Sequence, residues 1–439
     1  MQSDTSPSHS SEIIALSSPR SAVHGAPTKV EDKPVNPPPI TFPDGGIRAW
    51  SNIAGCFLLS FTSYGQLNAF GVFQTYYSQT LLHGHSVSTI AWIGSTQLTI
   101  SYVAGCILGR MFDIYGSRVL LVSGCLLSTF SLMMTSLATK YYQILLAQGF
   151  GLGIGIALQF YPILAVPSHW FCANRAAAIG IVIAGSSLSG IIYPIMLSRL
   201  FVSVGFPWAV RIVAFMNFGC QVLAIPFVKE RFPPRLGIPL VDWQAFRETT
   251  FLLHALGGFF VAFALYTPYW YIELFSLQKG VGANLSFYMI AIMNAAGLVG
   301  RVVTGYAADK YGRFNTLAPV TLLGGISVLA IWATSWHTAE IVVFVLIFGF
   351  TSASYSSLAS TATAQVTSDP SRIGARTGMF MTAMSPGILT GPSIAGAIVD
   401  ASNGGYLGLQ IFVGVFLVAG AALALAARWN GARSLVAVF

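Results

Sequence analysis

Charged residues are scarce in this sequence. Asp, Glu, Lys and Arg make up 8% of its 439 residues, whereas 54% are hydrophobic and the mean hydropathy is +0.70. A soluble domain carries ~25% charged residues, so this composition excludes an ordinary soluble fold and predicts a protein with many membrane spans. The first 43 residues contain no apolar run, which argues against a signal peptide and predicts a disordered tail.

Residues suited to metal or redox chemistry are also few. The five cysteines have no paired spacing, so we expect neither a disulfide framework nor a metal site. His254 is the one histidine well inside a predicted helix, whereas an enzyme embedded in a membrane would need clustered His, Asp or Ser. The sequence therefore predicts no enzyme activity, no metal and no bound cofactor, while proton coupling stays open.

Apolar runs are abundant instead. Runs of about 20 residues, enough to cross a hydrocarbon core of ~30 Å, recur along the chain from Ser51 to Ala427. They predict an all-α membrane protein with twelve transmembrane helices in two six-helix, pseudo-symmetric bundles. The expected segments are a cytoplasmic tail (1–43), a first bundle (44–228), a cytoplasmic linker (229–248), a second bundle (249–428) and a short tail (429–439).

The net charge of +8 is distributed unevenly. If the N-terminus is cytoplasmic, 17 of the 22 Lys and Arg fall in cytoplasmic segments. Four fall outside, namely Lys140, Arg199, Arg211 and Lys279, and Arg301 is the one left over. By the positive-inside rule this places both termini in the cytoplasm, and we expect the plasma membrane as the location. The basic charge thus follows the membrane topology, and we expect no nucleic-acid partner.

Two turns of the chain repeat. At an offset of 196 residues, four positions of the first half match four of the second: Gly109 with Gly305, Asp113 with Asp309, Tyr115 with Tyr311 and Gly116 with Gly312. Gly180 with Gly378 and Pro194 with Pro392 agree at 198. Parallel repeats of this kind are typical of transporters whose site lies between the halves near the bilayer midplane.

The repeated turn also carries a family resemblance. The pattern G-x-x-x-D-x-x-G-x-R at 109–118, repeated at 305–313, resembles the signature loop of the major facilitator superfamily. PDGGIRAW (43–50) and HWFCANRAAAIGIVIAGSS (169–187) resemble its monocarboxylate-porter branch, especially the fungal members. The resemblance implies the major facilitator fold and transport by alternating access.

Charged side chains gather at these turns, at the cytoplasmic ends of the predicted helices. They are Asp113, Arg110, Arg118, Asp309, Lys310 and Arg313. An ion-pair network there can hold the two halves shut in one state and break in the other. By the family resemblance, this set is the cytoplasmic latch of the superfamily.

Two departures from the animal lactate carriers bear on the substrate. The first helix reads NAFGVFQTYY (68–77), without the Lys of those carriers, and Gly297 replaces the acid found four residues before the Arg of helix 8. These absences favour efflux of a larger, weakly acidic metabolite, as from a secondary-metabolite pathway. Uptake of a monocarboxylate or vitamin is the alternative, and a non-transporting sensor a second one. Apart from the substrate and the lipid bilayer, we expect no obligate partner.

Arg301 is the strongest candidate for substrate binding. It precedes Asp309 by eight residues, which places it about 12 Å along the helix from the cytoplasmic end, where an Arg is costly and functional by default. Asn294 lies nearly two turns earlier on the same face, and Asn68 of helix 1 is the expected partner in the other half. A planar guanidinium suits a carboxylate or enolate. Alternatively, Arg301 caps carbonyl groups of a neighbouring helix.

The run YTPYWYIELF (266–275) is the other conspicuous stretch near the middle of the chain. Tyr and Trp gather at membrane interfaces, so we favour an interfacial belt slightly over a substrate gate. We expect no Asp or Glu as deep in any span as Arg301.

Overall fold

Helices form all the regular secondary structure of the residues described in the computed structural model. These residues are 42–431 without 69, 86, 232–241, 368, 370 and 371, and the side chains of four more (Val87, Ser88, Cys106 and Asp113) are not described either. Lipid supplies no hydrogen-bond partners, and a helix satisfies its own backbone, so long apolar runs fold this way. The all-α prediction is confirmed for this part of the chain.

The first half of the chain contains nine α-helices and three shorter turns of helix. They are α1 (Ile47–Asn68), α2 (Phe70–Tyr76), the π-helical η1 (Tyr77–Leu81), α3 (Val87–Val103), α4 (Gly105–Leu137), α5 (Tyr141–Ile144), the π-helical η2 (Leu145–Gly151), α6 (Leu152–Ala165), α7 (Pro167–Trp170), α8 (Arg175–Ser203), α9 (Gly205–Ala224) and the 3-10 turn η3 (Ile225–Phe227).

The second half follows the same plan. Its elements are the 3-10 turn η4 (Ala245–Arg247), α10 (Thr249–Leu265), α11 (Thr267–Gln278), α12 (Ala283–Tyr311), α13 (Arg313–Ser327), the π-helical η5 (Val328–Trp332), α14 (Thr338–Gln365), α15 (Ile373–Ala401) and α16 (Leu407–Gly431).

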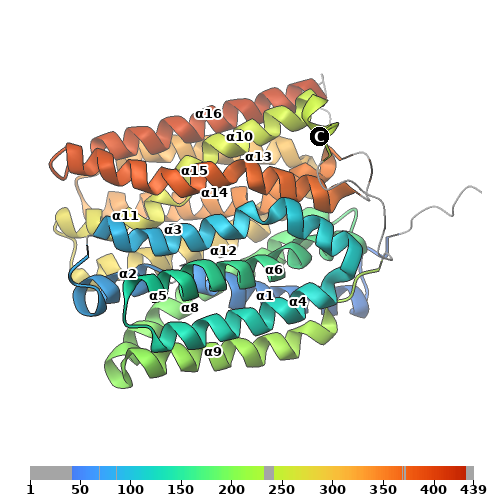
Figure 1. Ribbon diagram of the computed structural model, residues 1–439. Helices are drawn as coiled ribbons and strands as arrows, with labels where there is room; N and C mark the ends of the chain where they lie inside the picture. Colours follow the sequence, from blue (N-terminus) through green and yellow to red (C-terminus); the bar gives the residue numbers. More distant parts are fainter. Residues whose placement is uncertain are drawn as a thin grey trace, which may run out of the picture. The chain divides into compact units, whose positions relative to one another are not determined.

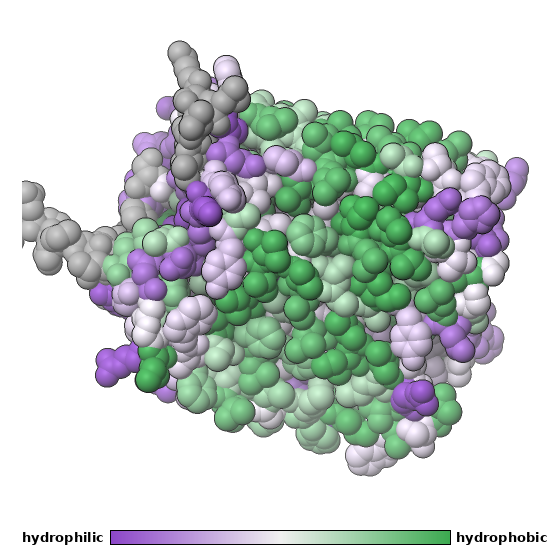
Figure 2. Space-filling model, turned by 180° about the vertical axis from the view of Figure 1, so that it is seen from behind, coloured by the Kyte–Doolittle hydropathy of each residue, from purple (hydrophilic) through white to green (hydrophobic). Residues whose placement is uncertain are grey.

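Nine helical segments of the described residues are long and apolar enough to cross a membrane. The other three predicted spans are helical too, formed by α1 to η1, by α3 with the beginning of α4, and by α15. The observed helices are therefore consistent with the twelve predicted passes. Figure 2 shows one face of the molecule, on which hydrophobic side chains cover the middle of the helices and hydrophilic ones lie toward both ends, as expected for helices that cross a membrane.

The helices run side by side between two ends (Figure 1). One end, here called the basic end, contains the beginnings of α1, α8 and α15 and the last turn of α12. Hydrogen bonds join these parts, for example from the Ala177 N–H at the beginning of α8 to the Asp309 carboxylate at the end of α12, at 2.8 Å. The opposite end contains η1, the last turn of α11 and the beginning of α14, where Gln278 donates to the Gly404 carbonyl oxygen at 3.2 Å.

Two glycines confirm the internal repeat. Gly116 and Gly312, aligned by the offset of 196, both have positive φ, 75° and 101°. The chain reverses direction at each, within α4 at Gly116 and between α12 and α13 at Gly312. Only glycine adopts this region at little cost, which explains why the turn needs it.

The two halves meet where α8 packs against α12 and α14 and where the consecutive α3 and α4 pack against α15. By its contacts the chain from Phe42 onward is one compact unit. The predicted tails fall mostly on 1–41 and 432–439, and half of the predicted linker falls on 232–241, and these three ranges lie outside the described residues. The division into tails, bundles and linker therefore stays a prediction.

Candidate functional site

A cavity of about 360 Å³ lies between the two halves. Its wall extends from buried Arg301 and Met381 to exposed Thr75 and Gln79 at the opposite end, so it opens away from the basic end. The polar side chains on its wall include Asn68, Gln74, Ser186, Glu273, Asn294, Arg301, Ser352 and Ser356. The aromatic ones are Tyr64, Phe70, Tyr102, Phe160, Tyr266, Tyr269 and Trp270.

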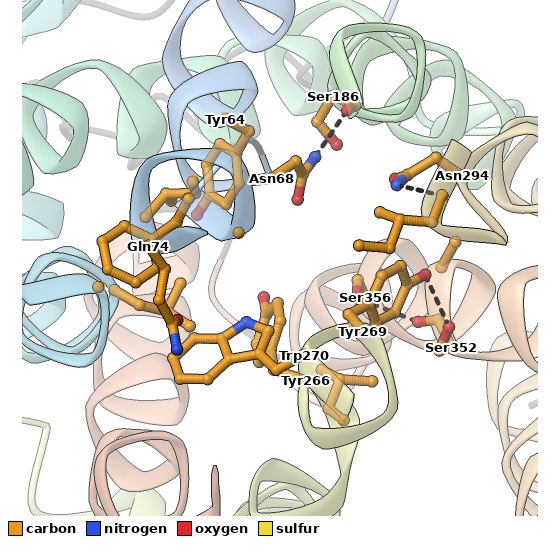
Figure 3. A pocket seen from close by; sticks show the side chains of 18 of the residues that line it. Tyr64, Asn68, Gln74, Ser186, Tyr266, Tyr269, Trp270, Asn294, Ser352 and Ser356 are labelled. Carbon is orange, nitrogen blue, oxygen red and sulfur yellow. Dashed lines mark hydrogen bonds between the residues drawn. The ribbon is translucent and has the colours of Figure 1, made fainter. Parts of the chain in front are cut away.

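All three predicted ligand residues line this cavity. Figure 3 shows Asn68, which comes from α1, and Asn294, which comes from α12, around the same space. Asn294 is 4% exposed, donates to the Ile290 carbonyl oxygen of its own helix and packs against Gly190 of α8. Arg301 is 9% exposed. The structure thus brings together residues that the sequence placed in different halves.

Arg301 lines the cavity and also caps carbonyl groups of neighbouring helices, the alternative considered from the sequence. Besides lining the cavity, its guanidinium donates to the Ile183 carbonyl oxygen of α8 at 2.6 Å and to the Ala353 carbonyl oxygen of α14 at 3.3 Å. It also donates to the Ser186 hydroxyl. The bonds to Ile183 and Ser186 join the halves, because α8 belongs to the first half and α12 to the second, whereas the bond to Ala353 lies within the second half. These bonds together use Nε and Nη1, whereas no described residue accepts from Nη2.

Ser186 is a site residue that the sequence analysis missed. Its hydroxyl accepts from Arg301, and its carbonyl oxygen accepts from the Asn68 amide at 2.7 Å, as Figure 3 shows for Asn68. One turn of α8 therefore contacts a predicted ligand residue from each half. A serine in an apolar helix gives no sign of this in the sequence, since most such hydroxyls bond to their own helix.

The internal repeat shows that Arg301 has no equivalent arginine in the first half. Gly105 precedes it by 196 residues and packs against Gly378 of α15, a β-carbon on Gly105 lying 2.6 Å from the Gly378 carbonyl oxygen. In the second half, the backbone of Arg301 packs in the same way against Gly180, which aligns with Gly378. Equivalent positions of the two halves thus carry a glycine and an arginine, and the described residues lining the cavity include one guanidinium.

The aromatic run at 266–275 is a cavity wall, so the prediction of an interfacial belt is wrong for its centre. α10 ends at Leu265 and α11 begins at Thr267, and Tyr266, Tyr269 and Trp270 line the cavity (Figure 3). The Tyr266 hydroxyl lies 2.8 Å from that of Tyr102, across the two halves. The residue types in this run predict how deep in the membrane the side chains lie, but not whether they face lipid or the cavity.

Glu273 is an acid of the cavity wall that was not predicted, but it is less buried than Arg301, so the expectation that no acid lies as deep as Arg301 stays a prediction. It is half-buried and lines the same cavity as Arg301. Glu273 was not predicted as a site residue because it belongs to the run assigned to the membrane interface.

The structure supports a contact between halves at Asp309. Its carboxylate accepts the N–H groups of Ala176 at 3.0 Å and Ala177 at 2.8 Å, at the beginning of α8. Arg313 lies one turn further along the chain, with its guanidinium 3.9 Å from the same carboxylate. A carboxylate at a helix N-terminus is stabilised by the unpaired N–H groups and the helix dipole. Asp309 thus connects the halves at the basic end.

The other predicted latch residues do not join this contact. Arg110, Arg118 and Lys310 form no ion pair with any described residue, and Lys310 lies over the Tyr311 ring at 5.3 Å. Lys310 is adjacent to Asp309 on α12, so the two side chains point in different directions, whereas the chain reversal at Gly312 leaves Arg313, the first residue of α13, near the carboxylate. The Asp113 side chain lies outside the described residues.

A charged cluster near the beginning of α15 was not predicted. Asp242 lies 3.0 Å from Arg376 and 3.2 Å from Arg372, and Glu248 lies 2.6 Å from Arg376. Burial alone would raise the pKa of Asp242, but the two arginines outweigh it and lower that pKa below its usual value. The cluster ties the segment before α10 to α15 within the second half.

Asp309→Asn is expected to loosen the basic end. The amide keeps one acceptor oxygen, so one N–H of Ala176 or Ala177 loses its partner and the charge is lost, which costs about 1–3 kcal/mol. The test is the rate at which maleimide modifies Ser168→Cys, a buried position at this end, in a background without the native cysteines. We expect faster labelling than in the matched control Lys310→Gln. Equal rates would show that Asp309 does not hold this end closed.

Among the residues that the structure describes, no group of three His, Cys, Asp or Glu side chains is placed to hold a metal ion. What the cavity offers is recognition: a guanidinium, amides, hydroxyls and aromatic faces between two halves of a membrane bundle.

Comparison with known proteins gives consistent matches. The family model described as Major Facilitator Superfamily matches residues 56–366. MFS-type transporter 1 of Ophiocordyceps sp. is 41% identical over 90% of this chain and 88% of its own length. The aspyridones efflux protein apdF of Emericella nidulans is 40% identical over 88% and 79%, and the fujikurins efflux protein of Gibberella fujikuroi 39% over 88% and 83%. The solved human organic anion transporter MFSD10 (TETRAN) superposes with a TM-score of 0.67 at 13% identity, over 87% of this chain and 99% of that one, a likeness of fold alone.

Proposed function

The chain belongs to the Major Facilitator Superfamily and is a membrane transporter, and from this premise we propose that it exports a weakly acidic metabolite through the cavity around Arg301. The observation that carries the proposal is one guanidinium in a cavity between the halves. No described residue accepts a hydrogen bond from its Nη2. Two related fungal proteins are named as efflux proteins, for aspyridones and fujikurins, which supports the direction. The monocarboxylate-porter-like branch stays a prediction.

In the proposed mechanism, Arg301 binds the acidic group of the substrate. Asn68 and Asn294 supply hydrogen bonds from either half, and the tyrosine rings cover the apolar part of the molecule. A bound anion competes with Ile183 and Ser186 for the N–H donors of Arg301. It therefore weakens the hydrogen bonds between Arg301 and α8. Substrate binding thereby acts on the contact between the halves, which is what alternating access requires.

The proposed topology places the basic end in the cytoplasm. The positive-inside rule supports it, because exposed Arg48, Arg118, Lys229 and Lys310 all lie at this end. The cavity then opens outward, and the structure represents the state that releases substrate to the outside. Export against a gradient needs an energy source, and the proton is the coupling ion we propose.

The proposal is tested in cells that naturally contain the protein. Disrupting its gene and comparing metabolites inside and outside by mass spectrometry should reveal a weakly acidic product retained inside. The wild-type protein should restore its release, and a protonophore should slow it. Normal release together with failed uptake of lactate, pyruvate or a vitamin would reverse the proposed direction.

A further inference from the structure

Glu273 is a charged residue of the cavity that the proposed function does not yet use. It lies in α11, and its neighbours Leu274 and Leu277 are exposed cavity residues. Among the described residues lining the cavity, it is the one acid, as Arg301 is the one base. The cavity wall therefore carries two opposite charges, one buried on α12 and one half-buried on α11.

The two charges do not neutralise each other. Glu273 forms no hydrogen bond or ion pair with any described residue, whereas Arg301 bonds to α8 and α14. The other titratable groups on the cavity wall are the tyrosines Tyr64, Tyr102, Tyr266 and Tyr269, which are neutral at physiological pH. An ionisable side chain inside a membrane protein without a partner is costly, and so it is a functional candidate.

Aromatic side chains occupy the wall of the same cavity. Tyr266, Tyr269 and Trp270 precede Glu273 on the same side, and the Trp270 ring lies 6.2 Å from that of Phe70 on the first half. Such a wall favours a flat, conjugated molecule. An acid bound to Arg301 alone would leave the Glu273 charge uncompensated, whereas a molecule with a second, donor pole would satisfy both.

We infer that Glu273 is a second recognition point of the transport site and that the substrate is bipolar. Its acidic group contacts Arg301, its aromatic or conjugated middle lies along the tyrosines and Trp270, and an amine or another hydrogen-bond donor contacts Glu273. The inference rests on the proposed function, because it requires the acid to bind at Arg301. On this inference, the negative charge of Glu273 on α11 determines which acids the site prefers.

The test uses matched pairs of small aromatic acids. Binding to the full-length protein in lipid nanodiscs is measured at neutral pH for 4-methylbenzoate and 4-(aminomethyl)benzoate, and for pairs with longer alkyl spacers. At the best spacer length, we expect the amine to bind at least about tenfold more tightly than its methyl partner, as a charge-assisted hydrogen bond allows. Glu273→Gln should reduce that ratio to about one, and Glu273→Asp should retain part of it.

Asp400→Asn is the matched control, because Asp400 is an exposed acid on α15 that does not line the cavity, and it should leave the ratio as in the wild type. A ratio near one in the wild type at every spacer length, or one that Glu273→Gln does not change, would overturn the inference while leaving the acid site intact. If no member of either series binds, the proposed acid site fails, and this inference with it.

Discussion

Arg301→Gln is expected to weaken binding of an aromatic carboxylate by about 10-fold to 150-fold. Hydrogen bonds to charged groups contribute about 1.5–3 kcal/mol, and each 1.4 kcal/mol is a factor of ten in affinity. Glutamine can still donate to the carbonyl oxygens of Ile183 or Ala353, so the protein should fold. Equilibrium dialysis with labelled 4-hydroxybenzoate and its neutral amide, 4-hydroxybenzamide, measures the effect, which should be confined to the acid.

The contrary result has a clear meaning, because Arg301 also joins the two halves. Ser186→Ala removes one acceptor of the guanidinium and leaves the charge in place. If Arg301→Gln and Ser186→Ala change binding of the acid and the amide equally, Arg301 acts as a structural link alone. Arg301→Lys separates charge from shape, since lysine keeps the charge without the planar pair of donors.

Gly109→Ala is expected to open the basic end. A β-carbon on Gly109 would lie 2.6 Å from the Gly374 carbonyl oxygen of α15, and one on Gly305 would lie 2.8 Å from the Ala176 carbonyl oxygen of α8. Both neighbours are backbone atoms, so the helices must separate. Overpacking of this kind costs about 1–3 kcal/mol, which shifts the equilibrium between conformations by about 5-fold to 150-fold.

Double electron–electron resonance can measure this opening as the distance between two spin labels. The labels are attached at Arg118→Cys and Tyr311→Cys, which are exposed positions in different halves. Gly109→Ala and Gly305→Ala should each enlarge the fraction of long distances. Gly219→Ala is the matched control, because nothing lies within 4 Å of its β-carbon, and it should match the wild type. Equal distributions in all three variants would show that these close contacts do not set the conformation.

Much of the fold follows from local properties of the chain. Long apolar runs must form helices in lipid, and the matching turns at Gly116 and Gly312 predict a repeat that the backbone confirms. Arg301, Asn294 and Asn68 were identifiable because polar groups at membrane depth are costly, and all three line one cavity. Their role in binding remains the proposal.

The direction in which a side chain faces did not follow from the sequence. The run at 266–275 has the composition of an interfacial belt, yet Tyr266, Tyr269 and Trp270 face the cavity. Glu273 was missed with them. Hydropathy cannot separate a side chain that faces lipid headgroups from one that faces a wet cavity, because both surroundings suit an amphipathic ring.

By itself, the sequence determined the membrane class, the helical fold, the pseudo-repeat and the single unpaired arginine. These depend on residue type and spacing, which act within one helix or between equivalent turns. Only the tertiary structure decided that one turn of α8 holds both Asn68 and Arg301, that Glu273 shares their cavity, and that the basic end is closed. Those features depend on contacts between residues more than a hundred positions apart, whose packing no local pattern encodes.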